Sequence, residues 1–174
     1  MNKNSDINQI RENFIDYWQN KKFKRIEPIS VIPQTKWSST FTLFVNSGLI
    51  RYIDITNKEG KLKYPMVTCQ PCIKLGTTKF SLEEMMLKDG YFTFFEQLTC
   101  CADEKTSIFW FVNKVWDYLI MINGIPPEKI YISVPISQPC LKEYWLKSGA
   151  LNKNIIFPNI NAFNLNLQEG KIHG

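Results

Sequence analysis

Two stretches decide the fold: residues 64–76 read YPMVTCQPCIKLG and residues 91–98 read YFTFFEQL. Both are rich in the β-branched and aromatic residues that favour strands. We therefore predict strands over Tyr64–Ile73 and Tyr91–Leu98, joined by a loop that runs from Gly76 to about Gly90.

Outward from these strands, the chain alternates between helical and extended patterns. Apolar residues at helical spacing predict helices; Ser5 is a candidate cap for the first, and Gly149 would end the last. The predicted helices run from Ser5 to Asn20, Thr106 to Ile122 and Pro139 to Lys147, and the further strands cover Phe41–Val45, Ile130–Val134 and Asn154–Phe157. This order predicts one α+β domain over residues 1–174, with helices flanking a largely antiparallel sheet.

The longest predicted helix has one apolar stripe. Its members recur at helical spacing and are Ile108, Val112, Val115, Leu119 and Ile122. We expect this stripe to face the core.

The composition is that of a globular chain. Of the 174 residues, 44% are hydrophobic, 14% aromatic and 21% charged, which excludes a disordered chain. No internal repeat or low-complexity segment occurs, so solenoid architectures are excluded as well. The length suits one compact core.

Three features bear on where the protein works. No apolar segment follows Met1–Asp6, so we expect no secretory signal. The apolar run 108–122 is interrupted by Asn113, Lys114 and Asp117, so we expect no membrane span. Without an export signal, the five cysteines are expected to be reduced thiols. These features together predict a cytoplasmic protein without a membrane partner.

The net charge of +5 comes from 21 basic and 16 acidic residues, and most of the basic residues are lysine. A lysine excess suits phosphate-bearing ligands or RNA, although lysine lacks the planar fork of arginine. A solvated lysine-rich surface explains the charge equally well. Charge alone therefore selects no function.

The sequence offers little for nucleophilic or metal catalysis. The sole histidine, His173, lies next to the last residue, so we expect no Ser-His-Asp or Cys-His catalytic unit. Cys69 and Cys72 have zinc-like spacing, with Cys100 and Cys101 as further candidates. Because residues three apart in a strand point to opposite faces, we expect free thiols and no metal ligand set.

One predicted strand carries a candidate ligand face. Alternation puts Phe92, Phe94 and Glu96 on the same side. With Lys74 and Lys79 nearby, such a face could stack a purine and receive its phosphates. Aromatic strands more often pack in a core, which would leave the lysines solvated. From the residues alone, core packing is the simpler interpretation.

Three short motifs follow one another along the chain: Leu43–Leu49 reads LFVNSGL, Cys69–Gly76 reads CQPCIKLG and Thr93–Leu98 reads TFFEQL. In order and spacing they resemble LFTNAGM, SQRCVRAG and TFFEML of the N-terminal catalytic domain of the alanyl-tRNA synthetases, a class II family. The resemblance covers Ile10 to about Trp145. It implies a class II synthetase-like antiparallel sheet flanked by helices, in which the strands around Lys74 and Phe94 are adjacent and antiparallel.

The resemblance also implies an activity and a set of roles. The family activates an amino acid with ATP and Mg²⁺, so Lys74 would hold the α-phosphate at the position of a family arginine. Phe94, or Phe92, would stack the adenine, and Glu96 would orient the nucleotide or its metal. Other residues implied to bind the nucleotide are Gln70, Thr78 and Lys79, and those implied to bind the amino acid are Asn46 and Leu49.

The departures from the family pattern concern residues that the resemblance implies bind ATP. Lys74 replaces an arginine, Thr78 stands at the family's loop lysine, and the third motif, with its adenine-stacking arginine, is absent. We also expect no room for the family's tRNA-binding, editing and dimerising regions. We therefore predict a reduced paralogue or fragment. It is either an ATP-dependent ligase, for tRNA or another acceptor, or an inactive binding or regulatory module; a homodimer is a further expectation.

Overall fold

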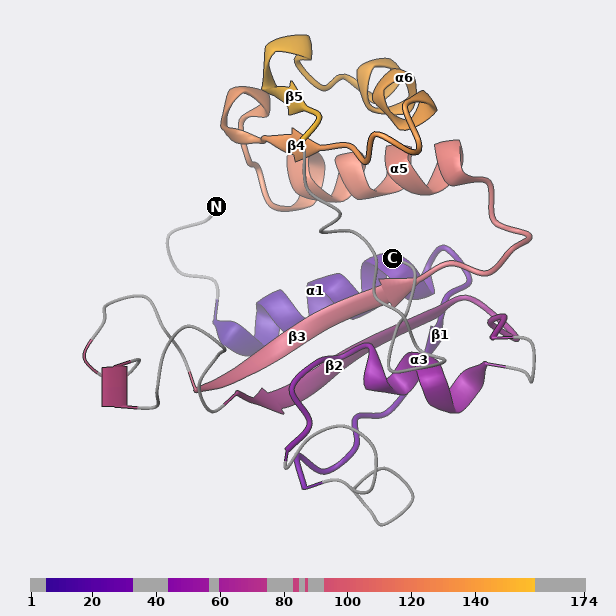
Figure 1. The fold of residues 1–174 in the computed structure, drawn as a ribbon. Coiled ribbons are helices and arrows are strands. Elements are labelled where there is room, and N and C mark those ends of the chain that lie inside the picture. Colours follow the sequence, from indigo (N-terminus) through magenta and orange to yellow (C-terminus); the bar gives the residue numbers. More distant parts are fainter. Residues whose placement is uncertain are drawn as a thin grey trace. The chain divides into compact units, whose positions relative to one another are not determined.

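The structure, a computed structural model, describes residues 6–32, 44–56, 60–74, 83–84, 87 and 93–158. It divides into two compact units, one from Ile7 to Glu104 and one formed mainly from Lys105 onward. Figure 1 draws the elements of both units. Each unit has its own buried core. The single domain over residues 1–174 stays a prediction.

The sheet of the first unit has three strands, in the order β1 (Lys24–Arg25), β2 (Met66–Ile73) and β3 (Phe94–Cys101). β1 runs parallel to β2, and β2 runs antiparallel to β3. The β2–β3 register places Met66 opposite Cys101 and Ile73 opposite Phe94. The prediction of adjacent antiparallel strands is thereby confirmed, while most of the predicted loop between them lies outside the described residues.

Alternating side chains give the β2–β3 pair two faces. The helix face consists of Val67, Cys69, Pro71 and Ile73 with Phe94, Glu96, Leu98 and Cys100. The Lys74 face consists of Met66, Thr68, Gln70 and Cys72 with Phe95, Gln97, Thr99 and Cys101. α1 (Ile7–Gln19) covers the helix face, and the turn that leads into α3 (Ile50–Ile55) lies on the Lys74 face (Figure 1).

α1 forms where the sequence predicts it, because its apolar residues fall on one side. Phe14, Ile15 and Trp18 are its buried residues. The Trp18 ring is 1% exposed, and its centroid lies 6.5 Å from that of Phe14 and 4.8 Å from that of Phe23. This aromatic group anchors α1 against the sheet. The predicted Ser5 cap lies outside the described residues.

The second unit contains α5 (Ile108–Asp117), the π-helical segment η1 (Tyr118–Ile122), the 3-10 turn η2 (Pro127–Lys129), β4 (Ile132–Ser133), α6 (Cys140–Ser148), the 3-10 turn η3 (Asn152–Asn154) and β5 (Ile155–Ile156). β4 and β5 pair in parallel. Its core is built around Trp116, Val134 and Ile155. α6 ends at Gly149, which has a left-handed φ of +109°, so the predicted glycine stop is confirmed.

Gly149→Ala is expected to lower the free energy of unfolding by about 1–2 kcal/mol, because a Cβ is strained in the left-handed conformation. A Cβ at this position would also lie 3.0 Å from Nε1 of Trp116. Thermal denaturation measures the loss, and exposed Lys147→Ala in the same helix is the control. Equal midpoints for the two variants would contradict this role of Gly149.

The predicted stripe of the long helix is wrong at both ends. Ile108 is 59% exposed and Ile122 is 46% exposed. Val112, a member of the predicted stripe, is buried as expected, whereas Trp116 and Ile120, which lie outside the predicted stripe, pack in the core of the second unit. From Tyr118 the backbone widens into π-helical geometry, and the Asn123 N–H donates to the Tyr118 carbonyl at 3.1 Å. The wider turn shifts the later side chains out of the α-helical pattern, which explains the exposure of Ile122.

Among the strand pairs of the described residues, the prediction of a largely antiparallel sheet holds for β2 and β3. β1 and the β4–β5 pair are parallel, and each of these strands is two residues long. Phe44 and Val45 are not in a strand, and the rest of the predicted strand Phe41–Val45 lies outside the described residues. In the part of the chain that the structure describes, no helix is both long and apolar enough to cross a bilayer.

Candidate functional site

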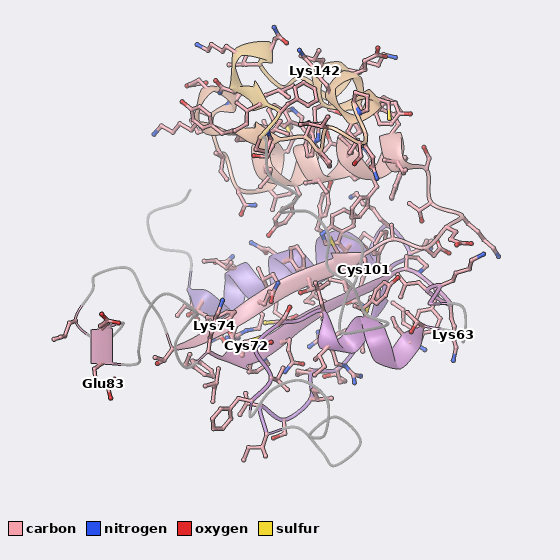
Figure 2. All side chains as sticks on the ribbon, viewed as in Figure 1. Lys63, Cys72, Lys74, Glu83, Cys101 and Lys142 are labelled. Carbon is pink, nitrogen blue, oxygen red and sulfur yellow. The ribbon has the colours of Figure 1, made fainter. Side chains whose placement is uncertain are left out.

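The open end of the β2–β3 pair carries Lys74. Its backbone N–H donates to the Thr93 carbonyl at 2.8 Å, so the pairing continues one residue beyond β2. The Lys74 side chain is exposed, and alternation places it on the same face as Cys72 and Phe95. Figure 2 shows Lys74 and Lys63 at opposite ends of β2. An ammonium and a phenylalanine ring thus share one face where the strands end.

Gln70 ties the connector after β1 to the Lys74 face. Its side chain is fully buried. Nε2 donates to the carbonyls of Ile29 at 2.9 Å and Pro71 at 2.8 Å, and Oε1 accepts from the Ile29 N–H at 3.0 Å. The carboxamide therefore satisfies both backbone polar groups of Ile29 inside the protein. Gln70, predicted to bind nucleotide, holds the backbone instead of presenting its amide to the surface.

Gln97 fixes the turn that carries Asn46 and Leu49. Its Oε1 accepts from the Gly48 N–H at 2.8 Å. A Cβ at Gly48 would collide with Oγ1 of Thr99, so only glycine permits this close approach. Asn46 is exposed and Leu49 is half-buried.

The same segment lies beside the end of β2. The Val45 carbonyl accepts from the Ile73 N–H at 2.8 Å, which places Asn46 next to the end of the strand that precedes Lys74. The structure therefore brings the predicted residues Asn46 and Lys74 to the same end of the sheet.

Glu96 belongs to the helix face and is paired there. Its Oε2 accepts from Arg11 Nη2 at 2.7 Å and from Arg11 Nε at 3.2 Å. This hydrogen bond raises the pKa of the Arg11 guanidinium. Phe94, 58% exposed, lies on the same face by strand alternation. Neither Glu96 nor Phe94 therefore reaches the face that carries Lys74. The predicted residues Phe92, Thr78 and Lys79 lie outside the described residues.

Phe95 is the aromatic residue that shares a face with Lys74, and the sequence analysis did not single it out. The alternation within β3 was identified correctly, but it does not reveal which of its two faces meets Lys74. The signal was available in the register: if Lys74 pairs with Thr93, then Phe95, two residues on, must share its face.

The described residues suit a phosphate better than a metal ion. No described carboxylate lies within ion-pair distance of Lys74, so its ammonium can receive an anion. Within the described ranges, no three His, Cys, Asp or Glu side chains come close enough to share a metal ion. Among the described residues, the Lys74 face thus offers an ammonium for an anion and no cluster of metal-binding side chains.

The thiols near the sheet differ in how deeply they are buried and in the face of the β2–β3 pair on which they lie. Cys69 lies on the helix face and Cys72 on the Lys74 face, as strand alternation predicts. Burial raises the pKa of Cys72 and of Cys101 to about 11, and that of Cys100 to about 12. Cys140 is exposed. Because thiolates are the nucleophiles, the buried thiols are expected to be unreactive near neutral pH.

At pH 8, iodoacetamide is expected to label Cys140 well before Cys72, Cys100 and Cys101, as read by mass spectrometry of tryptic peptides. Urea should expose all five cysteines.

Since folding raises the pKa values of Cys72, Cys100 and Cys101, the folded state binds more protons than the unfolded chain above the ordinary thiol pKa. Stability should therefore fall as the pH rises towards 11. Equal native labelling of Cys100 and Cys140 would contradict this assignment.

Comparison with known proteins gives the family. Residues 9–168 match the family model described as tRNA synthetases class II (A). The chain is 25% identical over 146 residues to the alanine–tRNA ligase of Coxiella burnetii (strain Dugway 5J108-111). It is 28% identical over 153 residues to that of Orientia tsutsugamushi (strain Ikeda).

These alignments cover 83% and 87% of this chain but only 16% and 17% of the two relatives. The chain therefore spans a small part of the length of the curated relatives that it matches. The family match, by contrast, runs through both units and includes the strands that carry Lys74 and Phe95. The resemblance inferred from the three motifs is confirmed, and the chain belongs to the class II (A) tRNA synthetase family.

Proposed function

We propose that this chain binds ATP and an amino acid on the Lys74 face and activates the amino acid as an acyl adenylate. The observation that carries the proposal is the exposed side chain of Lys74 at the open end of β2–β3, on the face of Phe95, with no described carboxylate within ion-pair distance. Exposed Asn46, at the same end of β2, adds a polar group for the amino acid. Because the relatives are alanine–tRNA ligases, alanine is the first amino acid to test.

The reaction assigns a charge role to Lys74. ATP supplies an electrophilic α-phosphorus; a carboxylate oxygen of the amino acid bonds to it as the bond to the bridging oxygen breaks, which yields the acyl adenylate and pyrophosphate. Lys74 would neutralise the negative charge that develops on the α-phosphate oxygens. Lysine does this as a point charge, without the two parallel hydrogen bonds of arginine.

Adenine stacking is proposed for Phe95, because it shares a face with Lys74. The earlier assignments to Phe94 and Glu96 are less favoured, since both side chains belong to the helix face and Glu96 is bonded to Arg11. Transfer of the activated group to tRNA or another acceptor stays part of the proposal, as does a homodimer.

A second candidate is a binding module without turnover. It is favoured by the pairing of Glu96 with Arg11 and by the lack of a described carboxylate near Lys74 that could hold Mg²⁺. Such a module would retain nucleotide binding at Lys74 and lose adenylation.

Pyrophosphate exchange into ATP, run with each standard amino acid beside an ATP titration, separates the candidates. Exchange supports the ligase, and ATP binding without exchange supports the module. Phe95→Ala should weaken ATP binding, whereas Phe94→Ala, the neighbour on the opposite face, should not. Failure to bind ATP at all, in folded protein, would overturn the ligase and the nucleotide-binding module alike and leave an inactive module for another ligand.

A further inference from the structure

The outer edge of β3, the side away from β2, carries a row of backbone polar groups. Because the Lys74 N–H donates to the Thr93 carbonyl, every second residue from Thr93 onward directs its N–H and carbonyl toward β2. The residues between them direct these groups away from β2. These outward residues are Phe94, Glu96, Leu98 and Cys100. In the part of the chain that the structure describes, none of their backbone groups has a backbone partner. The edge therefore offers a donor and an acceptor at each of these residues to another strand.

β3 lacks the features that keep an edge strand from pairing. Protected edges are short, carry lysine or proline, or are interrupted by a bulge. β3 is eight residues long, contains neither lysine nor proline, and pairs with β2 without a break in register. Its one charged side chain, that of Glu96, is neutralised by Arg11 at 2.7 Å. Phe94, 58% exposed, adds apolar surface at one end. This edge is therefore open to a further strand.

The opposite edge of the described sheet is protected by contrast. β1 is two residues long, and both residues, Lys24 and Arg25, are charged and exposed. So short a strand offers few backbone groups, and its two cations disfavour a second strand. Pairing with another chain is therefore expected at β3.

We propose that β3 pairs with β3 of a second copy of this chain, antiparallel and about a two-fold axis beside Gln97. Outward residues bond to outward residues, and in this register each of them has a partner. Phe94 lies opposite the partner's Cys100, and Glu96 lies opposite the partner's Leu98. Four such pairs form across the axis, with two hydrogen bonds in each.

The strand is complementary to itself in this register, which favours a second copy over an unrelated peptide. An axis beside any other residue of β3 leaves at least one outward residue without a partner. An axis beside Glu96 would also set two glutamates opposite each other, which is unfavourable. In the Gln97 register the exposed ring of Phe94 is instead covered by the partner's Cys100.

Pairing through β3 gives the homodimer of the proposed function an interface, and to that extent it rests on the proposed function. The two three-stranded sheets join into one continuous sheet. On the Lys74 face, Phe95 then lies opposite the partner's Thr99, so the partner borders the residue proposed to stack adenine. Dimer formation needs no nucleotide. A failure to dimerise is therefore distinguishable from a failure to bind ATP.

Sedimentation equilibrium of the full chain, without nucleotide and over a range of protein concentrations, measures the dimer. Leu98→Pro removes only a donor that points away from β2, so the β2–β3 bonds are kept. Because symmetry removes two hydrogen bonds at once, this variant should dimerise about 5- to 150-fold more weakly than wild type. Leu98→Val keeps the N–H and should dimerise like wild type.

A second pair of variants, Phe94→Pro and Phe94→Val, repeats the comparison at the first residue of β3, where proline is well tolerated. Thermal midpoints show which variants fold. Dimerisation of a folded proline variant as tight as that of its valine control would overturn the proposal. A wild-type chain that is monomeric at every concentration would overturn it as well.

Amide hydrogen exchange of the wild-type chain, read residue by residue by NMR, distinguishes a second copy from any other cover of the edge. The N–H groups of the outward residues should exchange more slowly as the protein concentration rises. The N–H groups of Phe95, Gln97 and Thr99 already face β2, so their exchange should depend much less on concentration. Slow exchange of the outward N–H groups in a monomer would overturn the proposal, in favour of a segment of the same chain at this edge.

Discussion

Gln70→Ala is expected to lower the free energy of unfolding by as much as about 6 kcal/mol, because it leaves two partly buried backbone groups without a hydrogen-bond partner, at a cost of up to about 3 kcal/mol each. The wild-type carboxamide bonds both the N–H and the carbonyl of Ile29, at 3.0 and 2.9 Å. Alanine offers neither a donor nor an acceptor. Since small domains are stable by only about 5–15 kcal/mol, this one change could unfold the first unit.

Urea denaturation followed by tryptophan fluorescence measures the effect, because Trp18 is buried in the same unit. Gln138→Ala is the matched control, as that glutamine is exposed in the second unit. A loss no larger than that of the control would show that water replaces the carboxamide at Ile29. Gln70 would then regain its place among the candidate ligands of the nucleotide.

Lys74→Ala is expected to weaken ATP binding by about 10–150-fold, the equivalent of a charge-assisted contact worth about 1.5–3 kcal/mol. The loss should be greater in pyrophosphate exchange if the contact tightens in the transition state. Lys74→Arg should be tolerated and could raise activity, because it restores the bidentate fork.

Isothermal titration with ATP measures all three proteins, with Lys129→Ala as a control for loss of one exposed lysine. Thermal midpoints should change by little, since exposed positions without contacts usually alter stability by no more than about 0.5 kcal/mol. Equal ATP affinity in wild type, Lys74→Ala and Lys74→Arg would rule out Lys74 as a phosphate ligand. It would leave a binding module for some other ligand as the better interpretation.

The long strands were predictable because their signal is local. Residues of β2 and β3 favour extended structure by themselves, and the motif match implied that the two strands are adjacent. The strands predicted over Ile130–Val134 and Asn154–Phe157 are present as the shorter β4 and β5. β1 gave no comparable signal, because a two-residue strand exists only through pairing with a distant partner. Long-range pairing of this kind leaves no pattern in the strand itself.

The candidate site was predicted in part for the same reason. Alternation correctly grouped Phe94 with Glu96, yet which face of β3 meets α1 depends on where that helix packs. Arg11 settles the question by bonding Glu96, a contact across 85 residues of sequence. Gln70 illustrates a related difficulty: a polar residue in a motif suggests a ligand, whereas the hydrogen-bond partner of Gln70 in the structure is the backbone of Ile29, which the sequence does not reveal.

The π-helical segment Tyr118–Ile122 has a consequence for aligning this chain with its relatives. A π-helical turn holds one residue more than an α-helical turn, so the segment is equivalent to an α-helix that has acquired an insertion. Where a relative continues as a regular α-helix, equivalent side chains match only if one residue here is left without a counterpart. Met121, 77% exposed, is the natural residue to leave unmatched, and an ungapped alignment would pair Ile122, the last residue of the segment, with the wrong side chain.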